Sequence, residues 1–414
     1  MKIHDLLVTE ISNSLDLIFF EDKQYADKVV EKALKRNKKW GSRDRKFFAE
    51  SIFEVTRWWR LLNYLHEGKD TSSEEVTDLK SLWALWWYWQ KNELLLEYTT
   101  LDKALIDQRI KLLNDPITKT QIPLAVRESI PNWLDKLGCM ELGEVEWSLL
   151  LPALNEKASV YLRVNLLKTS AKDLQSRLKS EDDIETELIT NECLKLHERK
   201  NVFITKSFLG GLFEVQDLSS QEVASFLDVQ PGQRVIDACA GAGGKSLHLA
   251  VHMKNKGRII ALDIHEWKLN ELKSRARRDG IDIIETRVIE NSKTIKRLEE
   301  SCDRLLLDVP CSGSGVIRRN PDTKWKLNSE EFERQKQLQF GLLRDYSKML
   351  KPGGKMVYST CSVFPSENEQ QVEAFLKSDV GQKFTLIEQK RLQPNTSPGD
   401  GFYMAVFLKR NNCS

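Results

Sequence analysis

The chain has 414 residues, of which 41% are hydrophobic and 30% charged, and its formal net charge is +2. This composition is typical of a globular protein of two or three domains and excludes a disordered chain. The nearly neutral charge excludes a uniformly basic protein, so a nucleic-acid site would have to come from local clusters of cations.

The seven cysteines indicate a reducing compartment rather than a disulfide-bonded secreted protein, because their number is odd and no two are spaced as CxxC. The N-terminal stretch lacks the basic and apolar segments of a signal peptide. The most apolar window, residues 82–90, is too short to span a bilayer. We therefore expect a cytoplasmic protein with no membrane partner.

Residues 1–150 are predicted to be helical, because glycine and proline are sparse and apolar residues recur three and four positions apart. Two such runs are Leu6, Leu7, Ile11, Leu15 and Phe47, Phe48, Ile52, Val55. Nine of the eleven tryptophans lie in this segment. The group at 83, 86, 87 and 89 could stack bases, but its helical spacing favours packing between helices.

Two short basic runs flank a Gly-Ser turn in this helical segment, with Trp40 between them. They comprise Lys35, Arg36, Lys38, Lys39, Arg43, Arg45 and Lys46. A charge run is usually a solvated helix face, whereas two runs beside an aromatic ring would suit phosphate contacts. The sequence favours neither interpretation over the other.

Residues 151–213 are predicted to form a small α/β domain. Its strands are expected at 159–167, 194–198 and 202–205, and a short amphipathic helix at 172–179.

From residue 214 onward, strands and helices alternate. The expected strands are 234–240, 258–264, 281–289, 304–309 and 355–360, the helices 215–229, 245–253, 265–280 and 330–350, and a final hairpin joins 384–390 to 401–410. This alternation predicts a doubly wound α/β sheet. In such sheets the ligand crevice lies at the carboxyl ends of the strands.

A glycine-rich turn, DACAGAGGKS (237–246), follows the first of these strands and opens a helix. Gly241, Gly243 and Gly244 would let the backbone turn tightly and approach a ligand. The spacing matches neither GxxxxGK[ST] nor GxGxxG. Asp263 ends the next strand, where a carboxylate can bind the hydroxyls of a ribose. The pair of features favours a dinucleotide or S-adenosylmethionine, while the alternative for Asp263 is a cap of the following helix.

Two cysteines follow the ends of strands 304–309 and 355–360, so both thiols should meet in one site beside Asp308. A hydride transferase needs no pair of thiols, but a pyrimidine C5 methyltransferase does. A thiolate that adds to C6 of cytosine makes C5 nucleophilic, an acid near N3 stabilises the adduct, and a second thiol can assist loss of the C5 proton. A single cysteine is ordinarily interpreted as an inert buried residue. Because Cys311 and Cys361 both follow strand ends, we favour a catalytic pair instead.

Two further groups of residues invite a functional interpretation. His248 and His252 lie four residues apart on one predicted helix, but no third ligand is near in sequence, so we expect surface histidines and no metal. The segment GVIRRNPDTKW (315–325) interleaves Arg318, Arg319 and Lys324 with Trp325. At the mouth of a catalytic cleft it is predicted to grip RNA phosphates or to stack a base, in preference to the alternative of an ordinary exposed loop.

At these residues the chain resembles the Sun (Fmu) family of RNA 5-methylcytosine methyltransferases. DVPCSGSG (308–315) resembles the fourth motif of the family and STCS (359–362) its sixth. GGLFEVQDLSSQ (210–221) and DGFYMAVFLKR (400–410) are also similar, and SRDRKFFAESIFEVTRWWRLLNYL (42–65) is similar to a NusB-like RNA-binding domain.

The resemblance implies a class I, Rossmann-like methyltransferase domain at 214–414, an all-α NusB-like domain at 1–150 and a small α/β connecting domain at 151–213. It also implies S-adenosylmethionine as cofactor, RNA as partner, 16S rRNA as substrate, and a monomer.

By the same resemblance, Cys361 would be the nucleophile and Cys311 the release residue, with Lys245 and Asp308 also in the active site. The cofactor pocket would be lined by Cys239, Ala240, Gly241, Ala242, Gly243, Gly244, Lys245, Asp263, Glu290 and Asp308. From the sequence itself, the two cysteines cannot be ranked.

The chain departs from the family pattern in two places. Gly241-Ala242 stands where the family has Ala-Pro, and losing the proline leaves the free loop less rigid, which would weaken cofactor binding. The third motif lacks its usual Asp, so Glu290 or Asn291 must serve the adenine end. Two alternatives stay open: a transfer RNA substrate with the same chemistry, and a non-catalytic RNA-binding factor for ribosome assembly.

Overall fold

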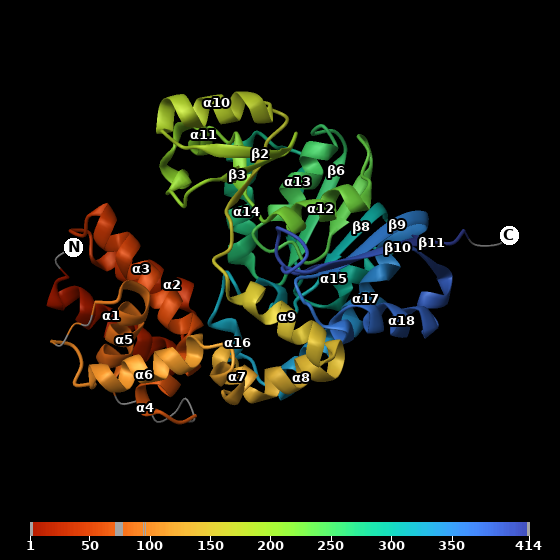
Figure 1. Ribbon diagram of the computed structural model, residues 1–414. Coiled ribbons are helices and arrows are strands. Elements are labelled where there is room, and N and C mark those ends of the chain that lie inside the picture. Colours follow the sequence, from red (N-terminus) through yellow and green to blue (C-terminus); the bar gives the residue numbers. More distant parts are fainter. Residues whose placement is uncertain (1–2, 71–77, 94, 96, 412–414) are drawn as a thin grey trace. The chain divides into compact units, whose positions relative to one another are not determined.

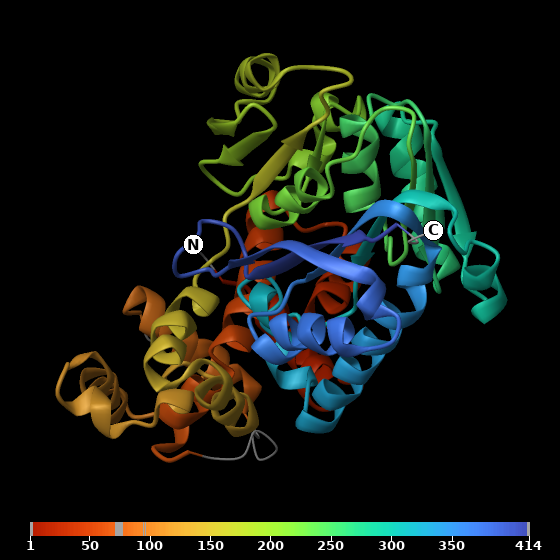
Figure 2. The ribbon, with the colours of Figure 1, turned by 90° about the vertical axis from the view of Figure 1, so that its right-hand side faces the viewer.

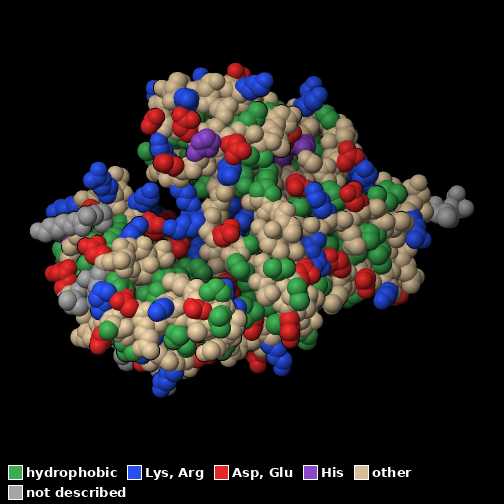
Figure 3. Space-filling model, in the orientation of Figure 1, with side chains coloured by type: hydrophobic (Ala, Val, Ile, Leu, Met, Phe, Trp, Pro, Cys, Tyr) green, Lys and Arg blue, Asp and Glu red, His purple; other side chains and the backbone are tan. Residues whose placement is uncertain are grey.

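The computed structural model describes residues 3–70, 78–93, 95 and 97–411. The chain divides into two compact units, one formed by Met1–Glu156 with Ile317–Glu331 and the other by Lys157–Val316 with Phe332–Ser414. No helix among the described residues is long and apolar enough to cross a membrane. On the face shown in Figure 3, cationic and anionic side chains are interspersed, in keeping with the small net charge.

The first unit is built from helices, as predicted for its N-terminal part. They are α1 (Asp5–Phe19), α2 (Ala26–Arg36), α3 (Ser42–Arg57), α4 (Trp59–Glu67), α5 (Leu79–Lys91), α6 (Lys103–Asn114), α7 (Leu124–Arg127), α8 (Asn132–Leu142), α9 (Glu144–Asn155) and α16 (Thr323–Lys326) (Figure 1). Trp83 and Trp86 are buried in its core. The prediction that this tryptophan group packs between helices is confirmed for these two residues.

Part of the basic cluster of α2 and α3 already has partners within this unit. Lys35 pairs with Glu31, Arg36 pairs with Glu10, and the Arg45 guanidinium donates to the Leu34 carbonyl. Phosphate binding by the remaining cations stays a prediction.

The prediction that the cations of 315–325 grip RNA is wrong for Arg318 and Lys324, and the alternative of an ordinary exposed loop is wrong as well. Residues 317–331 belong to the helical unit, where Arg318 and Lys324 are buried. Lys324 Nζ donates to the Arg57 carbonyl at 2.7 Å and to Asn155 Oδ1 at 3.1 Å. Trp325 Nε1 donates to the Thr56 carbonyl. Burial lowers the pKa of Lys324 well below its usual range. The side chains of Lys324 and Trp325 are thus engaged in contacts within the helical unit, which composition alone could not reveal.

The second unit contains a small antiparallel sheet of order β2-β3-β1-β4. Its elements are β1 (Tyr161–Val164), α10 (Ala171–Asp182), β2 (Thr186–Thr190), β3 (Cys193–Leu196), α11 (Lys206–Leu209) and β4 (Phe213–Val215). The strand predicted at 202–205 is wrong, because Val202–Ile204 is a 3-10 helix whose first turn is capped by Asn201. The sequence analysis missed β2 and β4, which are short and largely without an alternating apolar pattern.

The same unit contains a seven-stranded sheet of order β10-β11-β9-β8-β5-β6-β7. The strands are β5 (Arg234–Asp237), β6 (Arg258–Asp263), β7 (Ile284–Val288), β8 (Cys302–Asp308), β9 (Leu350–Thr360), β10 (Phe384–Leu392) and β11 (Phe402–Lys409). From β9 to β7 neighbouring strands run parallel, and the hairpin β10–β11 adds two antiparallel strands. The α/β fold predicted from the alternation is confirmed.

Helices cover both faces of this sheet, because successive strand residues point to opposite sides and both sets are apolar. Ile236 and Leu305 face one core, and Val235 and Leu306 the other. The helices are α12 (Leu218–Leu227), α13 (Gly244–His252), α14 (Glu266–Asp279), α15 (Ser292–Lys296), α17 (Ser329–Tyr346) and α18 (Glu369–Lys377). Figures 1 and 2 show α12 to α14 in green on one side and α18 in blue on the other.

The predicted domain boundaries at residues 150 and 213 stay predictions. The division into compact units falls at residue 156 and keeps the small sheet with the large one.

Candidate active site

The two cysteines meet because β8 and β9 are parallel neighbours in the sheet. Asp308 at the end of β8 pairs in register with Ser359, so the loops that follow leave the sheet side by side. Cys311 Sγ lies 3.0 Å from Cys361 Sγ, and the backbone N–H of Cys361 donates to Cys311 Sγ at 3.2 Å. The predicted juxtaposition of the two thiols is confirmed.

The two thiols share a hydrogen bond in which either sulfur can be the donor. This hydrogen bond, together with burial, raises the pKa of the Cys311 thiol well above its usual range. The backbone N–H of Cys361 donates to the same sulfur, so Cys311 is held from two sides by the Cys361 residue.

A buried carboxylate holds the Cys311 loop in place. Glu367 is fully buried and accepts from the backbone N–H of Ser312 at 2.8 Å, from the Ser312 hydroxyl, and from Gln339 Nε2 at 2.8 Å. The loop after β9 is tied to the same network, since the hydroxyls of Ser314 and Ser362 lie 3.0 Å apart. These contacts fix the backbone on either side of both thiols.

Asp308 forms an ion pair at the mouth of the sheet. Lys245 Nζ donates to Asp308 Oδ2 at 2.5 Å, and the Ser359 hydroxyl donates to Oδ1 at 2.9 Å. Burial and the first-turn position on α13 both disfavour a cation at Lys245. The Asp308 carboxylate outweighs burial and raises the pKa of Lys245.

The glycine turn has the conformation expected for close approach to a ligand. Gly241 has φ +54° and Gly243 φ +88°, a region that side chains rarely adopt. A Cβ at Gly241 or Gly244 would point into open space, whereas one at Gly243 would collide with Leu272 of α14. Gly243 therefore serves packing, and the other two leave the backbone open to a ligand.

Asp263 holds this turn from the neighbouring strand. Its Oδ2 accepts from the Gly241 N–H at 2.9 Å, and its Oδ1 accepts from the His265 N–H at 2.8 Å. A ribose could still be held by the remaining lone pairs, because each carboxylate oxygen accepts more than one hydrogen bond.

Glu290 lines a separate cavity of about 430 Å³ beyond the end of β7, together with Asn291, Ile295 and Tyr346. Burial raises the pKa of Tyr346 to about 12, and electrostatic interactions with Cys239 and Asp263 act in the same direction. The cavity therefore lies within electrostatic range of the predicted cofactor residues. The Cys239 thiol follows β5, and burial raises its pKa well above the usual range.

The prediction that His248 and His252 are surface histidines without a third ligand nearby is wrong. His248 is buried, and the Nε2 atoms of both rings lie 3.1 and 3.0 Å from the same oxygen, Glu192 Oε2. Glu192 is distant in sequence and lies in the turn between β2 and β3, so no spacing pattern could have predicted that it contacts the two histidines.

Sequence reasoning also missed Glu367 and Asp237. Asp237 ends β5 just as Asp263 ends β6, so its position at a strand end could have been recognised in the sequence. Asp237 Oδ2 accepts a hydrogen bond from the Ser246 hydroxyl at 2.6 Å. Burial raises the pKa of Asp237 to about 7. Glu367 had no signal, because it lies six residues beyond Cys361 in a polar stretch.

Comparison with known proteins identifies the family. A sequence model described as 16S rRNA methyltransferase RsmB/F matches residues 224–408, and one described as the ferredoxin-like domain of RsmF/B-like methyltransferases matches residues 130–203. A probable ribosomal RNA small subunit methyltransferase B of Synechocystis is 32% identical over 384 residues, with 85% of each chain covered. The chain belongs to the RsmB/F (Sun) family. The resemblance drawn from the motifs is confirmed.

Solved structures support the fold of this RsmB/F family member. The crystal structure of PH0851 has a TM-score of 0.79 at 24% identity and covers 99% of this chain and all of its own. NSun6 from Pyrococcus horikoshii with SFG has a TM-score of 0.63 at 20% identity and covers 69% of this chain and all of its own. At these identities the similarity shows the fold alone, and it confirms the Rossmann-like α/β assignment.

Removing one acceptor from the Glu367 network should loosen the Cys311 loop. Glu367→Gln exchanges a carboxylate oxygen for an NH₂ group, which faces donors it cannot satisfy. We expect the free energy of unfolding to fall by about 1–3 kcal/mol, because a buried donor is left unpaired. Circular dichroism should show this as a fall of about 2–10 °C in Tm.

The matched control for this change is Glu373→Gln, an exposed position on α18, which should leave Tm unchanged. Equal Tm values for the two variants would contradict a structural role of Glu367.

Proposed function

We propose that this chain transfers the methyl group of S-adenosylmethionine to C5 of a cytosine in 16S rRNA through a covalent adduct with Cys361. Family membership supports methylation of ribosomal RNA with this cofactor. The observation that supports C5 chemistry is the pair of sulfurs 3.0 Å apart, one in the loop that follows Asp308 and the other in the loop that follows β9. Methylation of a nucleophilic ring nitrogen or hydroxyl would need neither thiol.

In the first step the Cys361 thiolate adds to C6 of cytosine, and the electron pair of the C5–C6 double bond moves into the ring. We assign the proton of the 3.0 Å contact between the sulfurs to Cys311, whose S–H then stabilises the thiolate before it adds. Negative charge that reaches N3 is neutralised by a proton from Asp308. Lys245, 2.5 Å from that carboxylate, supplies the proton that Asp308 passes on.

In the second step C5 becomes a nucleophile and takes the methyl group that the cofactor, when bound, presents as an electrophilic sulfonium. The C5 proton must then leave. Once Cys361 is bonded to C6, its hydrogen bond no longer raises the pKa of the Cys311 thiol. Cys311 then loses its own proton to solvent, and its sulfur takes the C5 proton. The C5–H electron pair restores the C5–C6 double bond and expels Cys361, and the N3 proton returns to Asp308. The two sulfurs thus hold different roles although their loops look alike in sequence.

The residues that follow β5, β6 and β7 suit S-adenosylmethionine. Gly241 and Gly244 leave open space beside the backbone, and Asp263 lies at the end of the neighbouring strand for the ribose hydroxyls. The cavity with Glu290 and Tyr346 is the place for the adenine ring. The related NSun6 structure holds SFG, an analogue of this cofactor.

The target cytosine must be single-stranded or flipped out of a helix to reach the sulfurs. We assign binding of the flanking RNA to the helical unit, whose first residues are similar to a NusB-like domain, with the free cations of α2 and α3 as candidate phosphate contacts. We propose that the protein acts as a monomer in the cytoplasm.

A deletion strain should lose methylation at one cytosine of 16S rRNA, and the wild-type gene should restore it. The Cys361→Ala variant should not, because without the thiolate C5 stays unreactive; we expect activity to fall by more than about 10³-fold. Bisulfite sequencing of total RNA provides the measurement.

The same sequencing tests the substrate. Loss of a cytosine methyl group from transfer RNA, with 16S rRNA unchanged, would contradict the ribosomal assignment. Restoration by Cys361→Ala would contradict the nucleophile.

The Cys311→Ala variant should form the adduct but release it slowly, because no group takes the C5 proton. With RNA and cofactor, we expect a protein–RNA band that survives denaturing electrophoresis. The double variant Cys311→Ala, Cys361→Ala serves as the control and should give no band. Clean turnover by Cys311→Ala would assign proton removal to another group.

A further inference from the structure

We propose that Glu192, His248 and His252 form a site for a divalent transition-metal ion, best suited to Zn²⁺, that joins the small sheet to helix α13. The inference is independent of the proposed catalytic function. It rests on three ligand-type side chains that converge from two separate parts of the fold, with ligand atoms all within 4.8 Å of one another.

The geometry is that of three ligands on one ion. The Nε2 atoms of His248 and His252 lie 3.1 and 3.0 Å from Glu192 Oε2. Zn²⁺ bonds of about 2.0–2.1 Å in a tetrahedron place neighbouring ligand atoms about 3.3 Å apart. The observed edges therefore need to open by only a few tenths of an ångström to admit the ion. Two His and one carboxylate are among the ligand sets that bind Zn²⁺ in proteins.

Each of the three side chains is held in position by its own element. The two histidines are one helical turn apart on α13, so their rings project from the same face. Glu192 lies in the β2–β3 turn, where its carbonyl accepts from the Val164 N–H at 2.8 Å and its N–H donates to the Thr190 hydroxyl. The backbone of this turn is thus fixed to β1 before any ion binds.

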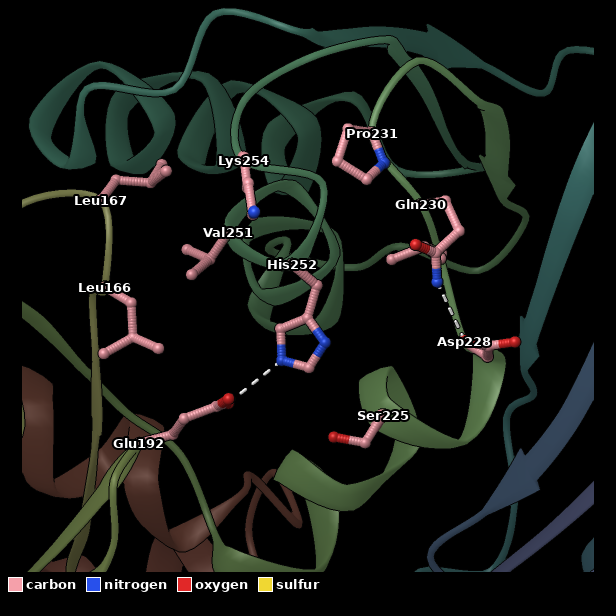
Figure 4. A pocket seen from close by; sticks show the side chains of 11 residues that line it. Leu166, Leu167, Glu192, Ser225, Asp228, Gln230, Pro231, Val251, His252 and Lys254 are labelled. Carbon is pink, nitrogen blue, oxygen red and sulfur yellow. Dashed lines mark hydrogen bonds and ion pairs between the residues drawn. The ribbon is translucent and has the colours of Figure 1, made fainter.

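An ion can reach the site and keep a water ligand. Glu192 and His252 line a cavity of about 620 Å³, whose other walls include Leu166, Ser225 and Lys254. Figure 4 shows the Glu192 carboxylate and the His252 ring pointing toward one another at the cavity wall. His248 lies behind them with 2% of its side chain exposed. Such a position leaves a fourth ligand site open toward the cavity.

Binding should tie together segments that are far apart in sequence. Helix α13 begins at the glycine turn and carries Lys245 in its first turn, one helical turn before His248. An ion bound by His248 and His252, in the C-terminal half of α13, would fix the helix against the small sheet. Because the unfolded chain does not hold the three ligands together, metal binding would also stabilise the fold.

The test uses the full chain, freed of any affinity tag and treated with a chelator, and titrates it with Zn²⁺ by calorimetry. We expect one equivalent to bind with a Kd below about 1 μM and to raise Tm. Glu192→Gln and His252→Ala should each weaken binding at least tenfold, whereas His197→Ala, an exposed histidine of the same small sheet, should not. Glu192→Gln preserves the shape of the side chain, so it reports on ligation even if His252→Ala disturbs folding.

A second arm separates this site from the paired thiols, which could also bind Zn²⁺. Binding to Glu192, His248 and His252 should persist in Cys311→Ser, and the Co²⁺ form should lack the near-ultraviolet charge-transfer band of a thiolate ligand. No stoichiometric binding below about 100 μM Zn²⁺ would overturn the proposal. Equal affinity in wild type, Glu192→Gln and His252→Ala, or loss of binding in Cys311→Ser, would overturn it as well.

Discussion

The parallel pairing of β8 with β9 is the constraint on which the active site depends. Each strand by itself delivers one cysteine to the edge of the sheet, and only their adjacency, with Asp308 opposite Ser359, brings the sulfurs to 3.0 Å. Strand pairing is strict in register, because a slip by one residue would turn every side chain to the opposite face and empty both apolar cores. The stability of the sheet thereby fixes the geometry of the two thiols.

Hydrogen bonds connect the polar groups around the thiols. The fully buried Glu367 satisfies three donors of the Cys311 loop and of α17, and Asp308 is held between Lys245 and Ser359. Displacement of Glu367 would leave these buried donors unpaired, which is costly. The two sulfurs therefore lie in a preorganised frame, and the two cysteine motifs of this chain serve packing as well as the proposed chemistry.

Several features could be predicted from the sequence because they depend on local pattern. The alternation of strands and helices predicted the doubly wound sheet. The positions of Cys311 and Cys361 after two strand ends predicted that their thiols lie close together. The glycine turn was predicted because a positive φ at Gly241 and Gly243 needs that residue.

Other features depend on contacts between distant segments. From the sequence, Lys324 and Trp325 resemble an RNA-binding loop, but the helical unit buries Lys324 and partly buries Trp325. Likewise, His248 and His252 gain their third partner from a turn more than fifty residues earlier in the chain. Glu367 accepts a hydrogen bond from Ser312, which is 55 residues away in the sequence and is brought near it by the pairing of β8 with β9.

The most direct test of the central claim uses an RNA substrate whose target cytosine carries fluorine at C5. The fluorine cannot leave as a proton does, so a wild-type enzyme that works through a C6 adduct should stay bound after methyl transfer. We expect mass spectrometry of the digested complex to find the nucleotide on the peptide that contains Cys361. Attachment to Cys311, or methyl transfer without any covalent complex, would contradict the account.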